Sequence, residues 1–201
     1  MYPYDRIVTL ALFDVDGTLL LSDDPVANRA LLDVLDPSLP DDAVSKLDHK
    51  GRTALWIAKQ LLGREPDGDW CARYEARYAE LLGDTSDWRT PDGAVEILGA
   101  LERRGVQLAL LTGNAERIAR LRMGRLGLAR FFPQGQGAFG CESEDRDELM
   151  RRALERARVR APNAVEIGDT PRDESSARAL GVRSIRVDEL RSFSELLELV
   201  P

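Results

Sequence analysis

Short apolar runs alternate with amphipathic stretches over most of the chain. Residues 7–13 (IVTLALF) form an almost unbroken apolar run, which predicts a strand that is buried on both faces. Later runs predict strands at 106–111, 164–168 and 183–187, with a weaker, glycine-broken candidate at 131–139. Helical spacing of apolar residues predicts helices at 91–105, 115–128, 145–158, 174–180 and 193–200. Strands that alternate with helices predict an α/β fold with a parallel, doubly wound sheet.

Residues 22–88 interrupt this alternation, because their patterns predict helices only. Ser22 or Asp23 is the expected cap of the first helix, with Pro25 in its first turn. Further helices are predicted from residue 41 or 42 to 47, from 51 to 62 and from 69 to 82. The Trp and Tyr residues of the last helix recur at helical spacing, which is typical of a core rather than of a ligand site. The chain is therefore expected to divide into a core domain of residues 1–21 and 89–201 and a helical domain of residues 22–88.

Three of the predicted strands end in a polar turn that contains glycine. The turns read DVDGT at residues 14–18, TGN at 112–114 and GDTPRD at 168–173. Each alone is typical of an ordinary turn, but the carboxyl ends of parallel strands meet at one edge of a sheet, where such folds bind ligands. Two acidic turns side by side would repel each other unless a cation lay between them, and their oxygen ligands suit Mg²⁺. The TGN turn precedes a helix, whose N-terminus can hold an anion.

The overall composition narrows the range of functions. The chain has 201 residues, a formal net charge of −7 and a pI of about 4.9, which does not favour a nucleic-acid-binding surface. Cys71 and Cys141 are far apart and have no metal-like spacing, so free thiols in a reducing compartment are expected. The N-terminus lacks the pattern of a signal peptide, and no run is long enough to span a membrane, so we expect a cytoplasmic protein.

The three motifs, in this order, resemble those of the haloacid dehalogenase superfamily of aspartate-nucleophile phosphatases. The helical stretch after the first motif is similar to the cap of the branch that contains phosphoglycolate phosphatases and β-phosphoglucomutases. The resemblance covers nearly the whole chain and implies a Rossmann-like core with an inserted α-helical cap. It also implies that Asp14 attacks the phosphorus to form an aspartyl-phosphate. Asp16 would protonate the leaving oxygen and then activate the hydrolytic water.

The resemblance assigns metal and phosphate ligands as well. Mg²⁺ would be held by Asp14, the backbone carbonyl of Asp16, Asp169 and Asp173. The phosphoryl oxygens would contact Thr112, Gly113 and Asn114. The family also places one cation near the phosphate, and Arg146 lies at the matching position. The alternative is that Arg146 is one more surface arginine, but the phosphate would then lack a fixed cationic partner.

The loop Lys50-Gly51-Arg52-Thr53 resembles the substrate-facing loop of the family's cap, although Ala54 stands where the family often has Asp. Arg52 would contact a substrate carboxylate or sugar group, or would serve only as a residue at a helix start, and the sequence leaves both open. His49 is the only histidine. We expect it at the surface, because Asp16 already fills the role of a base.

These features predict a Mg²⁺-dependent phosphatase that acts on a small phosphorylated metabolite, with a phosphoglycolate-like acid as the best candidate. A sugar phosphomutase with the same catalytic residues is one alternative. A non-catalytic, phosphate-ligand-binding regulatory protein is another, which the intact nucleophile and acid disfavour. Asp16 also disfavours a dehalogenase, because that reaction needs no proton donor there. Neither nucleic acid nor a membrane is an expected partner, and monomer and homodimer both stay open.

Overall fold

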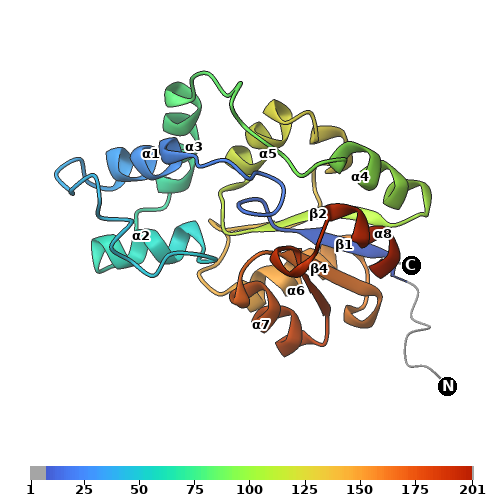
Figure 1. Cartoon of the computed structure of the whole chain (residues 1–201). Helices are drawn as coiled ribbons and strands as arrows, with labels where there is room; N and C mark the ends of the chain where they lie inside the picture. Colours follow the sequence, from blue (N-terminus) through green and yellow to red (C-terminus); the bar gives the residue numbers. More distant parts are fainter. Residues whose placement is uncertain (1–7, 201) are drawn as a thin grey trace.

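The computed structural model describes residues 8–200 and contains a five-stranded, wholly parallel sheet (Figure 1). The strand order is β3-β2-β1-β4-β5. The strands are β1 (Leu10–Phe13), β2 (Gln107–Thr112), β3 (Ala138–Phe139), β4 (Ala164–Gly168) and β5 (Arg183–Arg186). This arrangement confirms the predicted α/β fold with a doubly wound parallel sheet.

The central strand β1 sets the register of the sheet edge. Phe13, its last residue, pairs with Leu110 of β2 on one side and with Ile167 of β4 on the other. The residues that follow these positions therefore leave the sheet at the same edge, because all the strands run in one direction. This edge carries the DVDGT, TGN and GDTPRD turns.

Helices cover both faces of the sheet, and successive residues of β1 point to opposite layers. Ala11 and Phe13 pack in the cluster formed with α4 (Ala94–Arg103), α5 (Glu116–Arg125) and α8 (Leu196–Leu199). Leu10 and Leu12 pack in the cluster formed with α6 (Arg146–Ala157) and α7 (Pro171–Leu180). Across residues 8–200, none of the helices has the length and apolar character needed to cross a bilayer.

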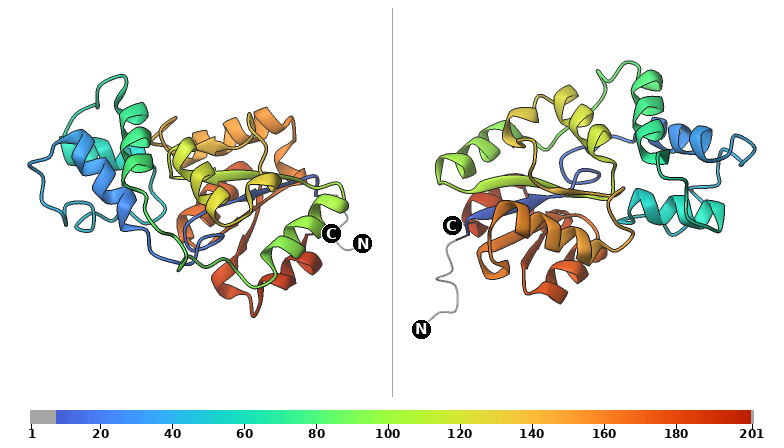
Figure 2. Two further views of the ribbon diagram at one scale, coloured as in Figure 1. Left: turned by 90° about the horizontal axis from the view of Figure 1, so that it is seen from above. Right: turned by 180° about the vertical axis from the view of Figure 1, so that it is seen from behind.

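Residues 22–88, which we call the helical insertion, lie beyond the carboxyl edge of the sheet (Figures 1 and 2). They contain α1 (Pro25–Leu35), α2 (Ala54–Leu62) and α3 (Trp70–Leu81). The insertion has its own apolar cluster, in which Trp70, Tyr74 and Tyr78 of α3 are buried beside Ala115 and Ile118 of the sheet-forming part. The prediction that these aromatic residues pack in a core is confirmed.

Several predicted boundaries are wrong, for local reasons. Residues 41–47 form turns rather than a helix, since only Ala43, Val44 and Leu47 are apolar in this largely exposed stretch. The cap of α1 is Asp24, whose Oδ1 accepts a hydrogen bond from the Val26 amide at 3.1 Å, and not Ser22 or Asp23.

The strand and helix ends also differ from their predictions. The first strand begins only at Leu10, and the first residue of its predicted range lies outside the described residues. Only Ala138–Phe139 of the weak candidate 131–139 pairs as a strand, beside Leu111 and Thr112. The closing helix starts as a 3₁₀ turn, Phe193–Glu195, before α8.

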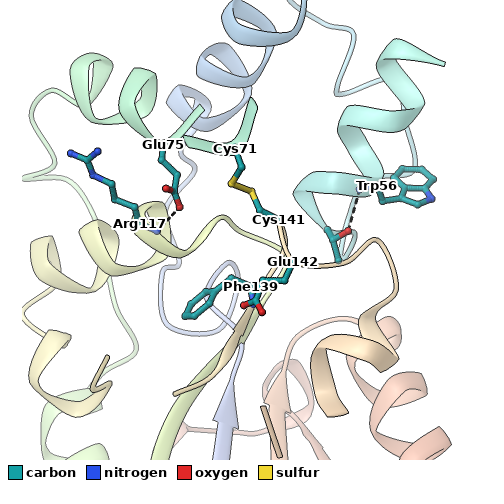
Figure 3. The surroundings of a disulfide bond; sticks show 8 residues. Trp56, Cys71, Glu75, Arg117, Phe139, Cys141 and Glu142 are labelled. Carbon is teal, nitrogen blue, oxygen red and sulfur yellow. Dashed lines mark hydrogen bonds between the residues drawn. A yellow bond between two sulfur atoms is a disulfide. The ribbon is translucent and has the colours of Figure 1, made fainter. Parts of the chain in front are cut away.

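The two cysteines are joined, which contradicts the expectation of free thiols. Cys71 of α3 and Cys141, two residues beyond β3, form a disulfide with their Cα atoms 6.2 Å apart (Figure 3). The sequence separation of 70 residues conceals this pair, because only the packing of α3 against the sheet edge brings the two residues together. The bridge links the helical insertion to the rest of the chain.

The N-terminus of α2 contacts the sheet edge directly. The first amides of a helix have no partner within the helix. Here the Ala54 amide donates to the Gly113 carbonyl at 2.8 Å and the Leu55 amide to the Gly140 carbonyl at 2.9 Å. A Cβ atom on Gly113 would lie 2.1 Å from the Arg52 oxygen, and one on Gly140 would lie 1.7 Å from the Gly113 oxygen. This approach therefore requires glycine at both positions.

We expect Gly140→Ala to lower the free energy of unfolding by about 1–3 kcal/mol, because its methyl group would overlap the Gly113 carbonyl and push α2 from the sheet edge. Urea denaturation measures the change. Gly124→Ala is the matched control, since a Cβ there meets open space among the described residues. That variant should gain about 0.5–1 kcal/mol, because alanine favours a helix over glycine. Equal effects of the two variants would contradict this account.

Candidate active site

Asp14 and Asp16 leave the end of β1 toward different surroundings. Asp14 is buried, with 6% of its surface exposed, and its amide donates to the Ile167 carbonyl at 2.9 Å. The side chain of Asp16 is 55% exposed and lies against Asn114 and Arg122. Two carboxylates from one turn thus occupy a buried, charged environment and a half-open one.

Asp14, Asp169 and Asp173 each offer a carboxylate oxygen, and these oxygens lie within 4.8 Å of one another. Burial and the neighbouring Asp173 raise the pKa of Asp14 well above its usual value. Burial and Asp173 also raise the pKa of Asp169, whose Oδ1 is buried without a hydrogen-bond partner among residues 8–200. A hard divalent cation would supply the missing positive charge and a partner for this oxygen, so the cluster fits Mg²⁺.

Glycine residues in the two acidic motifs make room for these carboxylates. Gly17 has a φ of +73°, and a Cβ atom there would lie 2.2 Å from Oδ2 of Asp169. A Cβ atom on Gly168 would lie 2.6 Å from Cγ of Asp173. The glycines of DVDGT and GDTPRD are therefore spatial requirements of the acidic cluster.

Asp173 is held from two sides. It is the third residue of α7, and its Oδ2 accepts hydrogen bonds from the Thr170 amide at 2.9 Å and the Thr170 hydroxyl at 2.6 Å. Thr170 in return accepts from the Asp173 amide, which completes a capping box. The other oxygen of Asp173 forms an ion pair with Arg146. Asp173 thus joins the start of α7 to the cation at the start of α6.

Arg146 is buried rather than on the surface. It is the first residue of α6 and is 8% exposed. Its Nη2 lies 3.5 Å from Oδ1 of Asp14. Burial alone would lower the pKa of Arg146, but Asp173 and Asp14 raise it, so the guanidinium is charged. The structure places a fixed cation beside Asp14.

The TGN turn follows the end of β2 and leads into α5. Thr112 is buried, and its Oγ1 accepts a hydrogen bond from Asn114 Nδ2 at 2.9 Å. Asn114 Nδ2 also donates to Oδ2 of Asp16 at 2.6 Å. Gly113 uses its carbonyl to bind α2. The structure therefore brings the TGN turn to Asp16 and to the helical insertion.

Arg52, the predicted substrate contact, lies at the junction of the insertion and the sheet edge. With Arg146 and Arg172 it lines a cavity of about 240 Å³. Its guanidinium lies 4.3 Å from the ring centre of Trp56, and its Nε is buried without a hydrogen-bond partner in the described part of the chain. His49 is half-buried, with Nδ1 3.1 Å from the Leu47 carbonyl oxygen.

Two charged residues near the site escaped the sequence analysis. Arg122 is 2% exposed and bonds to both oxygens of Asp16. The sequence feature that could have identified Arg122 is its position, four residues after Ile118 on the apolar face of a helix. Glu166 is fully buried in β4, where its signal was one carboxylate inside the apolar run AVEIG. Its Oε2 accepts a hydrogen bond from Ser184 Oγ at 2.7 Å.

Comparison with known families identifies the class of this site. A family model of haloacid dehalogenase-like hydrolases matches residues 11–187. The chain belongs to this family and is a hydrolase.

Its sequence relatives include phosphatases. It is 32% identical over 190 residues to a phosphoglycolate phosphatase of Rhodospirillum rubrum, with 85% of this chain and 76% of the relative covered. It is 30% identical over 203 residues to a phosphoglycolate phosphatase of Agrobacterium fabrum, with 96% and 85% covered.

Solved structures share the fold. CbbY from Rhodobacter sphaeroides, in complex with phosphate, superposes with a TM-score of 0.69 at 20% identity, covering 94% of this chain and 96% of that one. A predicted phosphoglycolate phosphatase from Haemophilus somnus superposes with a TM-score of 0.65 at 19% identity, covering 96% and 98%. At these identities the similarity establishes the fold.

We expect the stability of the metal-free protein to fall as pH rises from about 4.5 to 8, in part through Glu166. Burial, with the nearby Asp173, raises the pKa of Glu166 from 4.5 to about 8. The folded state therefore keeps a proton that the unfolded state releases, and stability is lost by up to about 1.4 kcal/mol per pH unit. Below about pH 4.5, Glu166 is protonated in both the folded and the unfolded state, so its contribution to stability is fully present.

Glu166→Gln should flatten this dependence, because the amide stays neutral and its oxygen can still accept from Ser184. Urea denaturation at several pH values, in chelator-treated buffer, measures the slope. The exposed Glu155→Gln serves as the control and should follow the native curve. Parallel curves for Glu166→Gln and the native protein would contradict the assignment.

Proposed function

We propose that this hydrolase is a Mg²⁺-dependent phosphatase that cleaves a small phosphate monoester through an aspartyl-phosphate on Asp14. The proposal rests on one observation: the two aspartates that follow β1, Asp14 and Asp16, have different surroundings. Asp14 points into the buried cluster with Arg146, whereas Asp16 lies in the half-open part of the site. Nucleophilic attack and proton transfer need two carboxyl groups in such different surroundings.

Asp14 is suited to attack the phosphorus because Arg146 lies beside it. The guanidinium would neutralise part of the phosphate charge while an oxygen of Asp14 forms the new bond to phosphorus. Asp14, the backbone carbonyl of Asp16, Asp169 and Asp173 are the residues that would hold Mg²⁺. Bound there, Mg²⁺ would reduce the repulsion between an anionic nucleophile and an anionic phosphate.

The TGN turn would hold the transferred phosphoryl group. The Thr112 hydroxyl, the Gly113 amide and the Asn114 side chain lie between the end of β2 and the start of α5, and they would donate hydrogen bonds to the phosphoryl oxygens. Asn114 also bonds to Asp16. The turn would thus fix the position of the phosphate relative to Asp16, the expected proton donor.

Asp16 would donate its proton to the leaving oxygen as the phosphorus–oxygen bond breaks. It would then take a proton from the water that hydrolyses the aspartyl-phosphate. Its half-open position gives access to both the leaving group and water.

The placement of Arg52 supports a phosphoglycolate-like acid as the substrate. Arg52 lines the same cavity as Arg146, so it would meet a substrate carboxylate while Arg146 contacts the phosphate. Two sequence relatives described above are phosphoglycolate phosphatases.

Phosphate release from a panel of monoesters, phosphoglycolate included, tests the proposal. The native protein should need Mg²⁺, and removal of Mg²⁺ by a chelator should abolish turnover. Asp14→Asn should lose at least about 10³-fold in kcat, because the amide cannot form the aspartyl-phosphate. Asp23→Asn, the same change at an exposed aspartate, should keep native activity. Full activity of Asp14→Asn, or inert monoesters throughout, would refute the proposal.

A further inference from the structure

Arg122 joins the predicted proton donor to the helical insertion. Its Nη1 lies 2.9 and 3.1 Å from the two oxygens of Asp16 and 2.9 Å from Oδ1 of Asn114. Its Nε and Nη2 lie 3.0 and 2.8 Å from Oδ2 of Asp24, at the start of α1. One guanidinium therefore contacts the sheet edge with one nitrogen and the insertion with the other two.

Tyr78 of α3 completes this arrangement. Its hydroxyl donates to Oδ2 of Asp24 at 2.7 Å and lies 3.4 Å from Nε of Arg122. The side chains of Arg122 and Asp24 are each 2% exposed, and Tyr78 is fully buried. Asp24 and Tyr78 thus fix the far side of the guanidinium, while its near side faces Asp16.

A buried arginine is costly to desolvate, and such networks often contribute little net stability compared with apolar residues. Arg122 stands on the face of α5 where Ile118, Ala119 and Met123 are buried, so an apolar residue would suit the packing. The charge at this position therefore calls for a role beyond stability. Its direct contact with Asp16 indicates which role.

Building on the proposed function, we propose that Arg122 is a positioning residue for Asp16 and links the placement of the insertion to proton transfer. As Asp16 gives its proton to the leaving oxygen, negative charge develops on its carboxylate. The guanidinium, aimed at both carboxylate oxygens, stabilises that charge and holds the carboxyl group in one orientation. In this step the Asp14–phosphorus bond forms, the phosphorus–oxygen bond breaks, and the Asp16 proton moves to the departing oxygen.

Substrates with different leaving groups distinguish a positioning role of Arg122 from a purely structural one. An alkyl phosphate such as phosphoglycolate needs a proton on its leaving oxygen, whereas p-nitrophenyl phosphate releases a stable phenolate. The kinetic constant kcat/KM reports the steps up to formation of the aspartyl-phosphate. For Arg122→Lys, kcat/KM should fall about 10- to 100-fold with phosphoglycolate, a share of the usual contribution of a general acid. With p-nitrophenyl phosphate it should fall less than about threefold.

Tyr78→Phe provides a milder variant that keeps the ring in place. It removes the hydroxyl that holds Asp24 against Arg122, and Tyr78 has no hydrogen bond to Asp16 among those of the described residues. Its loss should be smaller, about threefold, but show the same dependence on the leaving group. Arg120→Lys, on the same helix and paired with Glu116, is the control and should behave as native.

The outcomes separate this proposal from the one on which it rests. Equal losses with both substrates, in Arg122→Lys and in Tyr78→Phe, would overturn the positioning role while leaving the phosphatase intact. If the native protein hydrolyses neither substrate, the proposed function itself fails. Thermal unfolding of each variant confirms that the losses are measured on folded protein.

A second inference rests on the disulfide. Cys141 follows Gly140, whose carbonyl accepts the Leu55 amide of α2. Cys71 lies on α3, where Glu75 also accepts the Arg117 amide at the start of α5 (Figure 3). The bridge therefore fastens α3 to the same loop that holds the N-terminus of α2. Two helices of the insertion are thus tied to one point of the sheet edge.

We propose that the Cys71–Cys141 bridge is a redox latch that restrains the insertion against the sheet edge. A dithiol reductant would break the sulfur–sulfur bond by transferring two electrons, with its two protons ending on the cysteine sulfurs, and would leave as a disulfide. Where a protein meets such a reductant, its disulfides are typically transient or redox-sensing. Reduction would leave the hydrogen bonds, the packing and the ion pairs, such as Arg122–Asp24, to hold the insertion in place.

Hydrogen exchange of backbone amides tests the latch without an activity assay, because it reports how often the insertion opens in the oxidised and in the reduced protein. The amides of Ala54 and Leu55 should exchange at least about tenfold faster after reduction with a dithiol, because opening of the insertion exposes them to water. Cys71→Ser should exchange at the reduced rate under all conditions. Amides of α4, which packs on the sheet away from the insertion, should not change. Equal exchange of Ala54 and Leu55 in the oxidised and reduced protein would overturn the latch.

Discussion

Repulsion among carboxylates at one edge of a parallel sheet is the constraint on which the rest of the site depends. Asp14, Asp169 and Asp173 converge because their strands run side by side in the same direction. Burial and mutual repulsion raise the pKa of Asp14 and of Asp169, so the cluster is unfavourable without positive charge. Arg146 supplies part of that charge, and the geometry leaves a place for a cation to supply more.

Two buried arginines divide the site between them. Arg146 pairs with Asp173 and approaches Asp14, on the side of the expected nucleophile. Arg122 pairs with Asp16 and Asp24, on the side of the expected proton donor. A cation with fixed geometry on each side keeps the two carboxylates of one turn in different environments. The separation of the expected nucleophile from the expected proton donor thus depends on α5 and α6, and not on the DVDGT turn alone.

The sequence predicted the fold and the acidic cluster because both follow from local patterns. Apolar runs marked the strands, and parallel strands must bring DVDGT, TGN and GDTPRD to one edge. Arg122 was missed because its partners Asp16 and Asp24 lie 106 and 98 residues away. The Cys71–Cys141 pair was missed for the same reason, since it forms only where α3 packs on the sheet edge. Long-range contacts of the insertion are invisible to periodicity and motif spacing.

The TGN turn serves both parts of the molecule at once. Its Gly113 carbonyl accepts a hydrogen bond from the first amide of α2, while the Asn114 amide donates to Oγ1 of Thr112 within the turn at 3.3 Å. Asn114 bonds to Asp16, and the Asn114 carbonyl accepts the Gly140 amide at 2.7 Å. A shift of α2 would therefore move the backbone that is expected to hold the phosphate. The position of α2 and the geometry of the expected phosphate site are therefore coupled through Gly113 and Asn114.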